Sequence, residues 1–225
     1  MRLKDVAMIA ADTTRTFYYI KELIRNNLQP AHVFLLFSNN NQLLPGQNHI
    51  QSKDKLLETL EGSNISFEIC PSNNINDIEV VELIKKRKEA VFIFSGFGGV
   101  LLRKNILATG KKFLHVHGGY LPDYKGSTTN YFSLIHESTI GASAIFLTKD
   151  IDCGPVLLRK KFAPPVERAE IDHVYDSKVR AKVLIETLNN YVTDQKFNFE
   201  LENNIGGETY YIIHPVLKHL AILGD

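Results

Sequence analysis

Residues 111–126 read KKFLHVHGGYLPDYKG. An apolar run ends in His115 and His117, and a turn rich in Gly and Pro follows at once. Because side chains alternate along a strand, the two histidines lie on the same face. The stretch therefore predicts a buried strand that carries two imidazoles to a turn. They could be metal ligands, a catalytic pair or two ordinary polar residues at a strand end.

Apolar runs alternate with helical patterns on the N-terminal side of this stretch. Strands are predicted over 6–11, 32–38, 65–70 and 90–99, the last of which enters a glycine loop, and helices over 13–27, 53–62 and 76–89. Such alternation is typical of βαβ units. We predict an α/β fold, with a Rossmann-like, mostly parallel twisted sheet that has helices on both faces.

The second half of the chain changes character. A helix is predicted over 128–138, an antiparallel extension of the sheet over 141–149 and 154–162, and one long helix or two over 168–194. We predict a main domain over residues 1–194. A small C-terminal addition over 195–225, packed on the core, is interpreted as a hairpin or strand pair followed by a helix from Pro215.

Composition excludes several classes of protein. With 225 residues and a formal net charge of +1, the chain gives no strong electrostatic case for binding nucleic acid. Its two cysteines, Cys70 and Cys153, favour a reduced cytosolic setting over a disulfide framework. The N-terminal apolar run, broken by Asp5 and Asp12, is too short for a signal sequence or a membrane span. We expect a cytoplasmic protein without a nucleic-acid or membrane partner, which could form a homodimer through its C-terminal segment.

Ligands of open α/β sheets bind beyond the carboxyl ends of the strands. Four segments fall at that edge: ADTTR (11–15), SGFGG (95–99), HVHGG (115–119) and DIDCG (150–154). Each alone is a weak signal, and SGFGG lacks the spacing of a dinucleotide fingerprint or a P-loop. The histidine pair nevertheless sits where function is expected.

Taken together, these pieces resemble the N10-formyltetrahydrofolate-dependent formyltransferase family. The pattern of that family is N-x-H-P-x-L-L-P-x-[YF]-[KR]-G, then a helix, then G-x-[ST] opening a strand, then D-x-G-P. Here HVHGGYLPDYKG, TTNYFSLIHES, GASAIF and DIDCGPVLLRK follow in the same order. The resemblance covers residues 90–162 well and the rest in outline, and it makes 1–194 the catalytic domain.

The resemblance implies a catalytic trio. His117 matches the His of the family and Asp152 matches the Asp, whereas His115 occupies the position of the Asn. A ring N–H can donate a hydrogen bond to an oxyanion much as an amide can. The implied cofactor is N10-formyltetrahydrofolate, held largely by the backbone of Phe97, Gly98, Gly99, Val100 and Leu101 and of Lys149, Asp150 and Asp152.

The resemblance also implies an amine acceptor. A transfer RNA acceptor is disfavoured because the chain ends soon after the core and is nearly neutral. The glycinamide ribonucleotide branch keeps the Asn and a glycine-rich phosphate loop, whereas ADTTRTF contains no glycine. We expect a nucleotide-linked amino-dideoxy sugar, such as a UDP-4-amino-4,6-dideoxy sugar of the pseudaminic-acid type. Glycinamide ribonucleotide or an aminoacyl group stays open as another acceptor.

Candidate acceptor contacts follow from position in the sequence. Thr13, Thr14 and Arg15 begin a predicted helix, which suits a diphosphate, although Thr13 is equally an ordinary N-cap. Other candidates flank the HVHGG turn or lie in the tail, where YYIIHP could instead be a half-buried strand; they are Lys125, Asn130, Tyr210, Tyr211, His214 and Lys218.

Two other classes of function compete with this interpretation. H-x-H at a strand end is also typical of metal-dependent hydrolases, with Asp150 or Asp152 as a further ligand. Such sites need more ligands, and none of the other histidines has an obvious spacing to the pair, so we expect no metal. The third possibility is a non-catalytic folate or nucleotide binding module, in which His115 marks an altered site.

Overall fold

The computed structural model describes residues 2–38, 53–199 and 204–224. It contains two compact units, Met1–His115 and Val116–Asp225, called here the N-terminal and C-terminal units. Strand β7 (Lys112–His117) continues from one unit into the other, so each unit holds one of the two histidines. The predicted boundary at residue 194 is a different one and stays a prediction.

The N-terminal unit is built on parallel strands in the order β7-β6-β2-β4-β5. Their bounds are β2 Val6–Ala11, β4 Val33–Leu36, β5 Phe67–Ile69 and β6 Val91–Ser95. A separate short pair, β1 (Arg2–Leu3) and β3 (Gln29–Pro30), is also parallel. Every residue of β2 is buried, as expected of a central strand with neighbours on both edges.

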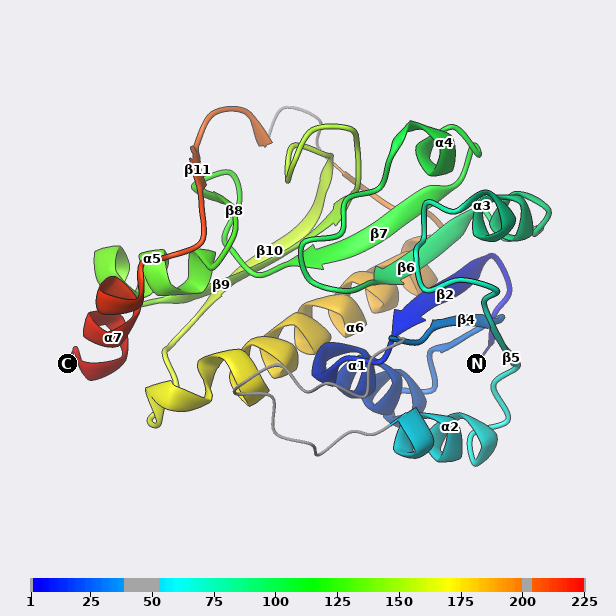
Figure 1. The fold of residues 1–225 in the computed structure, drawn as a ribbon, viewed down its shortest axis with the longest axis horizontal. Coiled ribbons are helices and arrows are strands. Elements are labelled where there is room, and N and C mark those ends of the chain that lie inside the picture. The colour runs from blue at the N-terminus through cyan, green and yellow to red at the C-terminus, as the bar shows by residue number, and fades with distance from the viewer. Residues whose placement is uncertain (1, 39–52, 200–203, 225) are drawn as a thin grey trace. The chain divides into compact units, whose positions relative to one another are not determined.

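Helices cover both faces of these strands (Figure 1). The chain runs outward from β2 to β4 and β5, then returns to β6 and β7, and right-handed crossovers place helices on opposite faces before and after that return. Figure 1 accordingly shows α1 and α2 below the strands and α3 and α4 above them. The bounds are α1 Thr14–Arg25, α2 Lys53–Glu61, α3 Ile78–Lys85 and α4 Lys104–Leu107. The predicted α/β fold with a mostly parallel sheet is confirmed.

The C-terminal unit adds antiparallel strands, as predicted. Strand β9 (Ile140–Phe146) pairs with β10 (Val156–Phe162), with a bulge between Val156 and Leu158. Helix α6 (Asp176–Asp194) packs on both strands, and α5 (Thr129–Glu137) packs on β9. The predicted helix over 168–194 begins instead with a 3₁₀ turn, Arg168–Glu170, and a π turn, Ile171–Tyr175.

The described part of the C-terminal segment pairs with an earlier strand of the chain. Among its described residues, β11 (Glu208–Tyr210) forms a parallel pair with β8 (Tyr124–Gly126), which lies far earlier in the chain. The predicted strand pair includes residues 200–203, which lie outside the described residues, so it stays a prediction. Helix α7 (Pro215–Leu223) begins at the predicted proline, as expected for the first helical position.

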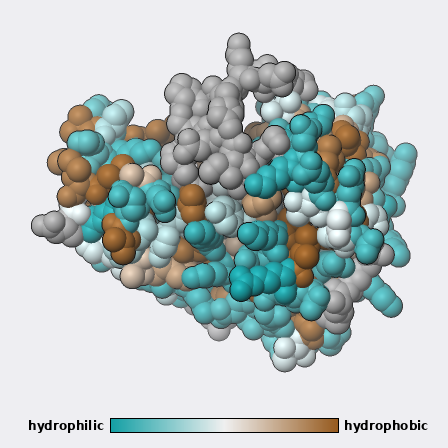
Figure 2. Space-filling model, turned by 90° about the horizontal axis from the view of Figure 1, so that it is seen from below, coloured by the Kyte–Doolittle hydropathy of each residue, from teal (hydrophilic) through white to brown (hydrophobic). Residues whose placement is uncertain are grey.

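Helix α7 is apolar, and most of its side chains are exposed. Val216, Leu217, Leu220 and Leu223 all face solvent. Figure 2 shows hydrophobic atoms gathered at the end of the molecule that carries this helix. Of the helices within 2–38, 53–199 and 204–224, none is both long and apolar enough to cross a bilayer.

Candidate active site

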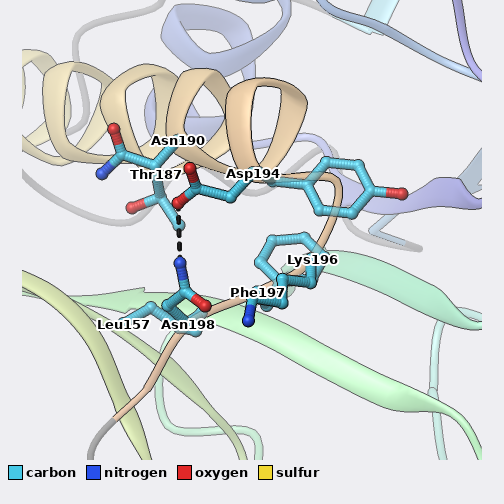
Figure 3. Close-up of a pocket in the computed structure, with 8 residues that line it drawn as sticks. Leu157, Thr187, Asn190, Asp194, Lys196, Phe197 and Asn198 are labelled. Carbon is cyan, nitrogen blue, oxygen red and sulfur yellow. Dashed lines mark hydrogen bonds between the residues drawn. The ribbon is translucent and has the colours of Figure 1, made fainter.

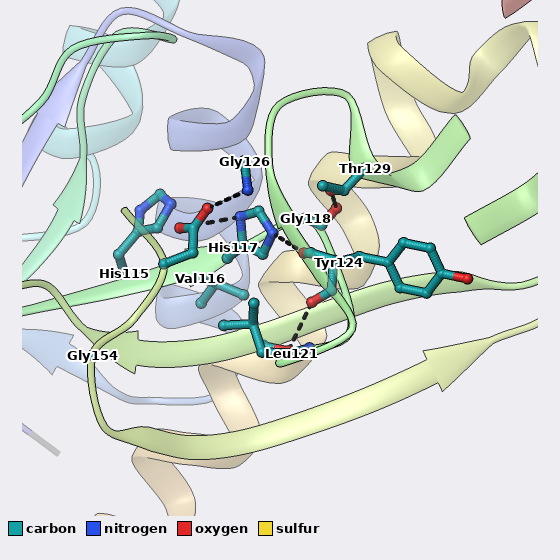
Figure 4. A network of polar contacts seen from close by, with 12 residues as sticks. His115, Val116, His117, Gly118, Leu121, Tyr124, Gly126, Thr129 and Gly154 are labelled. Carbon is teal, nitrogen blue, oxygen red and sulfur yellow. Dashed lines mark hydrogen bonds and ion pairs between the residues drawn. The ribbon is translucent and has the colours of Figure 1, made fainter. Parts of the chain in front are cut away.

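The end of strand β7 holds His117 in the interior of the C-terminal unit, with 5% of the residue exposed. Its Nε2 lies 2.8 Å from the backbone oxygen of Tyr124 (Figure 4). Because a carbonyl can only accept, Nε2 carries the ring proton. The other nitrogen, Nδ1, lies 3.4 Å from a carboxylate oxygen of Asp152.

Asp152 lies in the loop between β9 and β10 and is also buried. Its backbone φ is 53°, in the left-handed region that Asp tolerates better than most residues. The second carboxylate oxygen accepts a 2.8 Å hydrogen bond from the backbone N–H of Gly126. Strand β8 therefore holds both groups, the imidazole through Tyr124 O and the carboxylate through Gly126 N. We call these four residues the His117 cluster.

Burial sets the charge of the imidazole. Loss of hydration lowers the pKa of His117 below its ordinary value, and the neighbouring Arg180 lowers it further. The carboxylate of Asp152 opposes this effect without reversing it. At neutral pH the ring is therefore neutral, with a lone pair on Nδ1 that faces the carboxylate. This is the state that can take up a proton.

His115, in the N-terminal unit, is held in the opposite tautomer. Its Nδ1 lies 3.2 Å from the backbone oxygen of Phe94, so Nδ1 is the donor. In the neutral ring Nε2 is then an acceptor. An Asn at this position would offer N–H donors at every pH, whereas His115 can donate through Nε2 only when the ring is protonated.

Comparison with known proteins assigns the chain to a family. The sequence pattern of the family described as "Formyl transferase" matches residues 4–182.

The chain belongs to the formyl transferase family.

Formyl transferases use N10-formyltetrahydrofolate as formyl donor, in agreement with the cofactor predicted from the sequence. The match ends before the C-terminal segment.

The sequence relatives and the solved structures that resemble this chain come from different branches of the family. A methionyl-tRNA formyltransferase of Finegoldia magna is 32% identical over 95 residues, which cover 41% of this chain and 30% of that protein. An N-formyltransferase of Helicobacter canadensis, solved with folinic acid and dTDP-3-aminofucose, has a TM-score of 0.61 at 13% identity, covering 93% of this chain and 71% of that one. A phosphoribosylglycinamide formyltransferase of Anaplasma phagocytophilum has a TM-score of 0.63 at 12% identity, covering 95% and 99%.

The structural likenesses show the fold, since their identities are low. The chain matches less than half the length of each of the curated methionyl-tRNA formyltransferases. The comparisons thus establish the family and leave the amine acceptor open.

The glycine loop, residues 95–101, is the predicted folate-binding segment of the N-terminal unit. It turns through a hydrogen bond from Val100 N to Phe97 O at 3.4 Å, and Gly99 has a φ of 78°. Gly98, Val100 and Leu101 are exposed, the last by 58%, whereas Phe97 is half-buried. In the C-terminal unit, Lys149 and Asp150 are likewise exposed. Their contacts with folate stay predictions.

The predicted diphosphate residues begin helix α1. Thr13 is its N-cap, and the Oγ1 of Thr13 accepts a 3.2 Å hydrogen bond from Thr16 N. Thr14 is partly exposed. Arg15 donates from Nε to Ser95 Oγ at 3.2 Å and from a terminal nitrogen to Gly96 O. The guanidinium therefore braces the start of the glycine loop, and its binding of phosphate stays a prediction.

Other predicted acceptor contacts have structural partners within the C-terminal unit. The Lys125 ammonium is buried and bonds to the backbone oxygens of Asn204 and Gly206, at 3.2 and 2.7 Å. Asn130 is buried, and its amide bonds to Asp176 at 2.8 Å and accepts from Gly141 N at 3.1 Å. These contacts give both residues a part in the fold, and a contact with the acceptor stays a prediction.

Most of the candidates in the C-terminal segment also have structural partners. The ring of Tyr210 stacks on Tyr124, with centroids 5.5 Å apart, and packs on Phe132, as the half-buried interpretation of YYIIHP predicts. Tyr211 is exposed. His214 is the N-cap of α7, and its Nδ1 accepts from Val216 N at 3.3 Å. The Lys218 ammonium bonds to Asp172 at 2.5 Å.

A small cavity of about 60 Å³ lies between α6 and the segment that follows it (Figure 3). Thr187, Asp194, Phe197 and Asn198 line it, and none of the predicted site residues does. Its volume is far below the roughly 300 Å³ at which ligand pockets begin. Within the described ranges, no three His, Cys, Asp or Glu side chains are grouped so that they could hold a metal ion.

Three groups that hold His117 and Asp152 in place were not predicted from the sequence. Tyr124 O and Gly126 N act through the backbone, which a side-chain motif does not record. Asn204 contacts the loop of Asp152 from 52 residues away. The nearest signals are the glycine that ends DYKG and the asparagine before the Gly206–Gly207 pair.

Proposed function

We propose that the protein transfers the formyl group of N10-formyltetrahydrofolate to the amino group of a nucleotide-linked amino-dideoxy sugar. The observation that carries this proposal is the buried His117–Asp152 pair, whose two members strand β8 holds by separate backbone hydrogen bonds. A pair of this kind suits proton transfer without a covalent intermediate or a metal. The match to the formyl transferase family supplies the formyl donor.

The reaction needs one proton to be moved. The amine nitrogen attacks the formyl carbon, a C–N bond forms, and the carbonyl electron pair moves to oxygen. The attacking nitrogen then loses a proton toward Nδ1 of His117 and the Asp152 carboxylate. When the oxyanion collapses, the bond to N10 breaks and N10 receives a proton, which yields the formamide and tetrahydrofolate.

The tautomers suggest a different role for each of the two histidines. His117 keeps its Nε2 proton on Tyr124 O and presents Nδ1 to the transferred proton, so Asp152 stabilises the imidazolium that forms. His115 then stabilises the oxyanion, and by its hydrogen bond to Phe94 O it does so as a protonated ring. Replacement of His115 by Asn tests this, because an amide N–H can donate to the oxyanion in its place, so the variant should keep activity that His115→Ala loses.

Sugar N-formyltransferases among the proteins of the same fold support a sugar acceptor. The Helicobacter canadensis enzyme was solved with a dTDP-linked aminofucose, and the chain has the fold of that protein along nearly all of its length. We extend this to UDP-4-amino-4,6-dideoxy sugars of the pseudaminic-acid type. A transfer RNA charged with methionine is the second candidate, because several of the sequence relatives are methionyl-tRNA formyltransferases. Nucleic acid would then be a partner, against the expectation from charge.

A competition assay separates these acceptors. The purified protein is incubated with 10-formyltetrahydrofolate and, in separate reactions, with UDP- and dTDP-linked amino-dideoxy sugars, glycinamide ribonucleotide and methionyl-tRNA. Mass spectrometry should show a gain of one formyl group on an amino sugar alone. Formylation of methionyl-tRNA alone would replace the sugar proposal, and formylation of no amine by a folate-binding protein would favour a non-catalytic module.

Assembly and location complete the proposal. The exposed apolar side chains of α7 support a homodimer, which sedimentation of the parent and of a Leu220→Glu variant would test. A cytoplasmic location is proposed on the cysteine content and on the folate donor.

A further inference from the structure

The segment after the matched family region reaches the His117 cluster through one side chain. Asn204 is 6% exposed, although residues 205–209, which follow it in the sequence, are all exposed. Its Nδ2 lies 2.7 Å from the backbone oxygen of Asp152 and 2.8 Å from that of Gly154. Both partners are carbonyls, so the amide nitrogen is the donor and both of its protons are used.

These two hydrogen bonds hold the backbone on either side of Cys153. The first of the two carbonyls belongs to Asp152 itself, whose φ of 53° is uncommon for a residue other than glycine. A conformation of this kind persists only where the surroundings fix it. The loop is also tightly seated, because a Cβ added at Gly154 would collide with Phe146 O.

We propose that Asn204 is a positioning residue of the active site: it fixes the backbone of Asp152 and so keeps the carboxylate against Nδ1 of His117. The proposal rests on the proposed function, because it concerns the geometry of proton transfer. Asn204 touches neither reacting group, and it acts through the loop that carries one of them.

The same segment also holds the other side of the cluster. Strand β11 pairs with β8 in the register Glu208↔Tyr124 and Tyr210↔Gly126. The ammonium of Lys125, on β8, bonds to the backbone oxygen of Asn204 at 3.2 Å. Asn204 therefore connects the loop that carries Asp152 with the strand that donates to its carboxylate.

The test compares Asn204→Ala with a matched control, Asn198→Ala. Asn198 lies in the same segment, is exposed, and bonds through its amide to Asp194 at 2.6 Å. In Asn204→Ala we expect kcat to fall by about 10²-fold, as for a misplaced catalytic group, with KM for both substrates within about twofold of the parent. Asn198→Ala should match the parent in both constants.

A second measurement does not depend on catalysis. The N–H of Gly126 donates to the carboxylate of Asp152, so its exchange with solvent reports whether that carboxylate is in place. Hydrogen exchange followed by NMR should show protection of the Gly126 amide reduced by about tenfold or more in Asn204→Ala, and unchanged in Asn198→Ala. If no acceptor is formylated by the parent, the proposed function fails while this measurement still tests the positioning.

A folded Asn204→Ala variant with the kcat and the Gly126 protection of the parent would overturn the proposal. Should that variant lose its cooperative unfolding transition, Asn204→Ser takes its place, because one hydroxyl can donate to only one of the two carbonyls. An intermediate loss of kcat and of Gly126 protection in Asn204→Ser supports the positioning role, and parental values refute it.

Discussion

The glycine loop of the N-terminal unit and the His117 cluster of the C-terminal unit hold their functional groups in opposite ways. Gly98, Val100 and Leu101 are exposed, and no atom lies within 4 Å of a Cβ built at Gly98 or Gly99. His117 and Asp152 are buried, and defined backbone groups contact them. Rearrangement of the exposed loop by a ligand should therefore cost little free energy, whereas the groups of the cluster are already held in position without a ligand. On the proposed function, this difference corresponds to the distinction between binding of the formyl donor and transfer of a proton.

The largest expected effect comes from the cluster. His117→Asn and Asp152→Asn should each lower kcat by about 10²- to 10⁴-fold, because each removes a partner in proton transfer. Steady-state kinetics with the acceptor found by mass spectrometry would measure this. His219→Asn, at an exposed position of α7, is the control and should leave kcat unchanged. Turnover of either cluster variant at the parental rate would refute the catalytic assignment.

The glycines of the two regions should differ in their tolerance of a side chain. Gly126 has a φ of 96°, and a Cβ there would collide with Tyr210 O on β11. We expect Gly126→Ala to lower the free energy of unfolding by about 1–3 kcal/mol. Gly98→Ala has open space around the added Cβ and should change it by less than about 1 kcal/mol. Urea unfolding of both variants makes the comparison, and equal losses would contradict it.

The exposed loop should affect binding without affecting chemistry. Leu101→Ser removes an apolar side chain that is 58% exposed, and we expect KM for the formyl donor to rise by about tenfold with kcat little changed. Leu223→Ser, at 66% exposure on α7, is the matched control and should leave KM as it is. A fall in kcat with constant KM would place Leu101 among the groups that act in the transition state.

The smallest effect is a pH dependence of stability. Burial lowers the pKa of His117, so the unfolded chain takes up a proton near pH 6.5 that the folded chain refuses. The stability that comes from keeping His117 neutral in the folded chain is fully present above about pH 6.5 and is lost as the pH falls below that value. His117→Asn should reduce the slope of the free energy of unfolding against pH by at most about 1.4 kcal/mol per pH unit. Urea unfolding between about pH 5 and 7 measures that slope.

A second histidine sharpens that measurement. Burial likewise lowers the pKa of His32 in the N-terminal unit, followed in size by the effect of Arg87. His32→Asn should therefore reduce the slope in the same direction and provides the comparison between units. Parallel curves for the parent and His117→Asn would show that burial does not disfavour the charged imidazole.

Local pattern predicted the elements whose cause is local. Strand β2 has the predicted bounds, 6–11, because a continuous apolar run suits a central strand, and α1 begins directly after its N-cap, Thr13. The pairing of β11 with β8 has no such signal, since neither three-residue strand shows a periodic pattern. The tautomers of His115 and His117 could not be predicted from the sequence either, because each is fixed by a backbone oxygen that the fold brings to the ring.

The parallel pairing of β11 with β8 has a consequence for the order in which the molecule is made. The two strands lie more than eighty residues apart in the chain. The hydrogen bond from Lys125 to Gly206 O likewise joins residues more than eighty positions apart. A ribosome that has completed β7, β8 and β9 has synthesised His117 and Gly126, yet Asn204 and β11 are still to come. The sheet of the N-terminal unit can form early during translation, whereas the hydrogen bonds from Asn204 to the loop of Asp152 can form only after Asn204 has been synthesised.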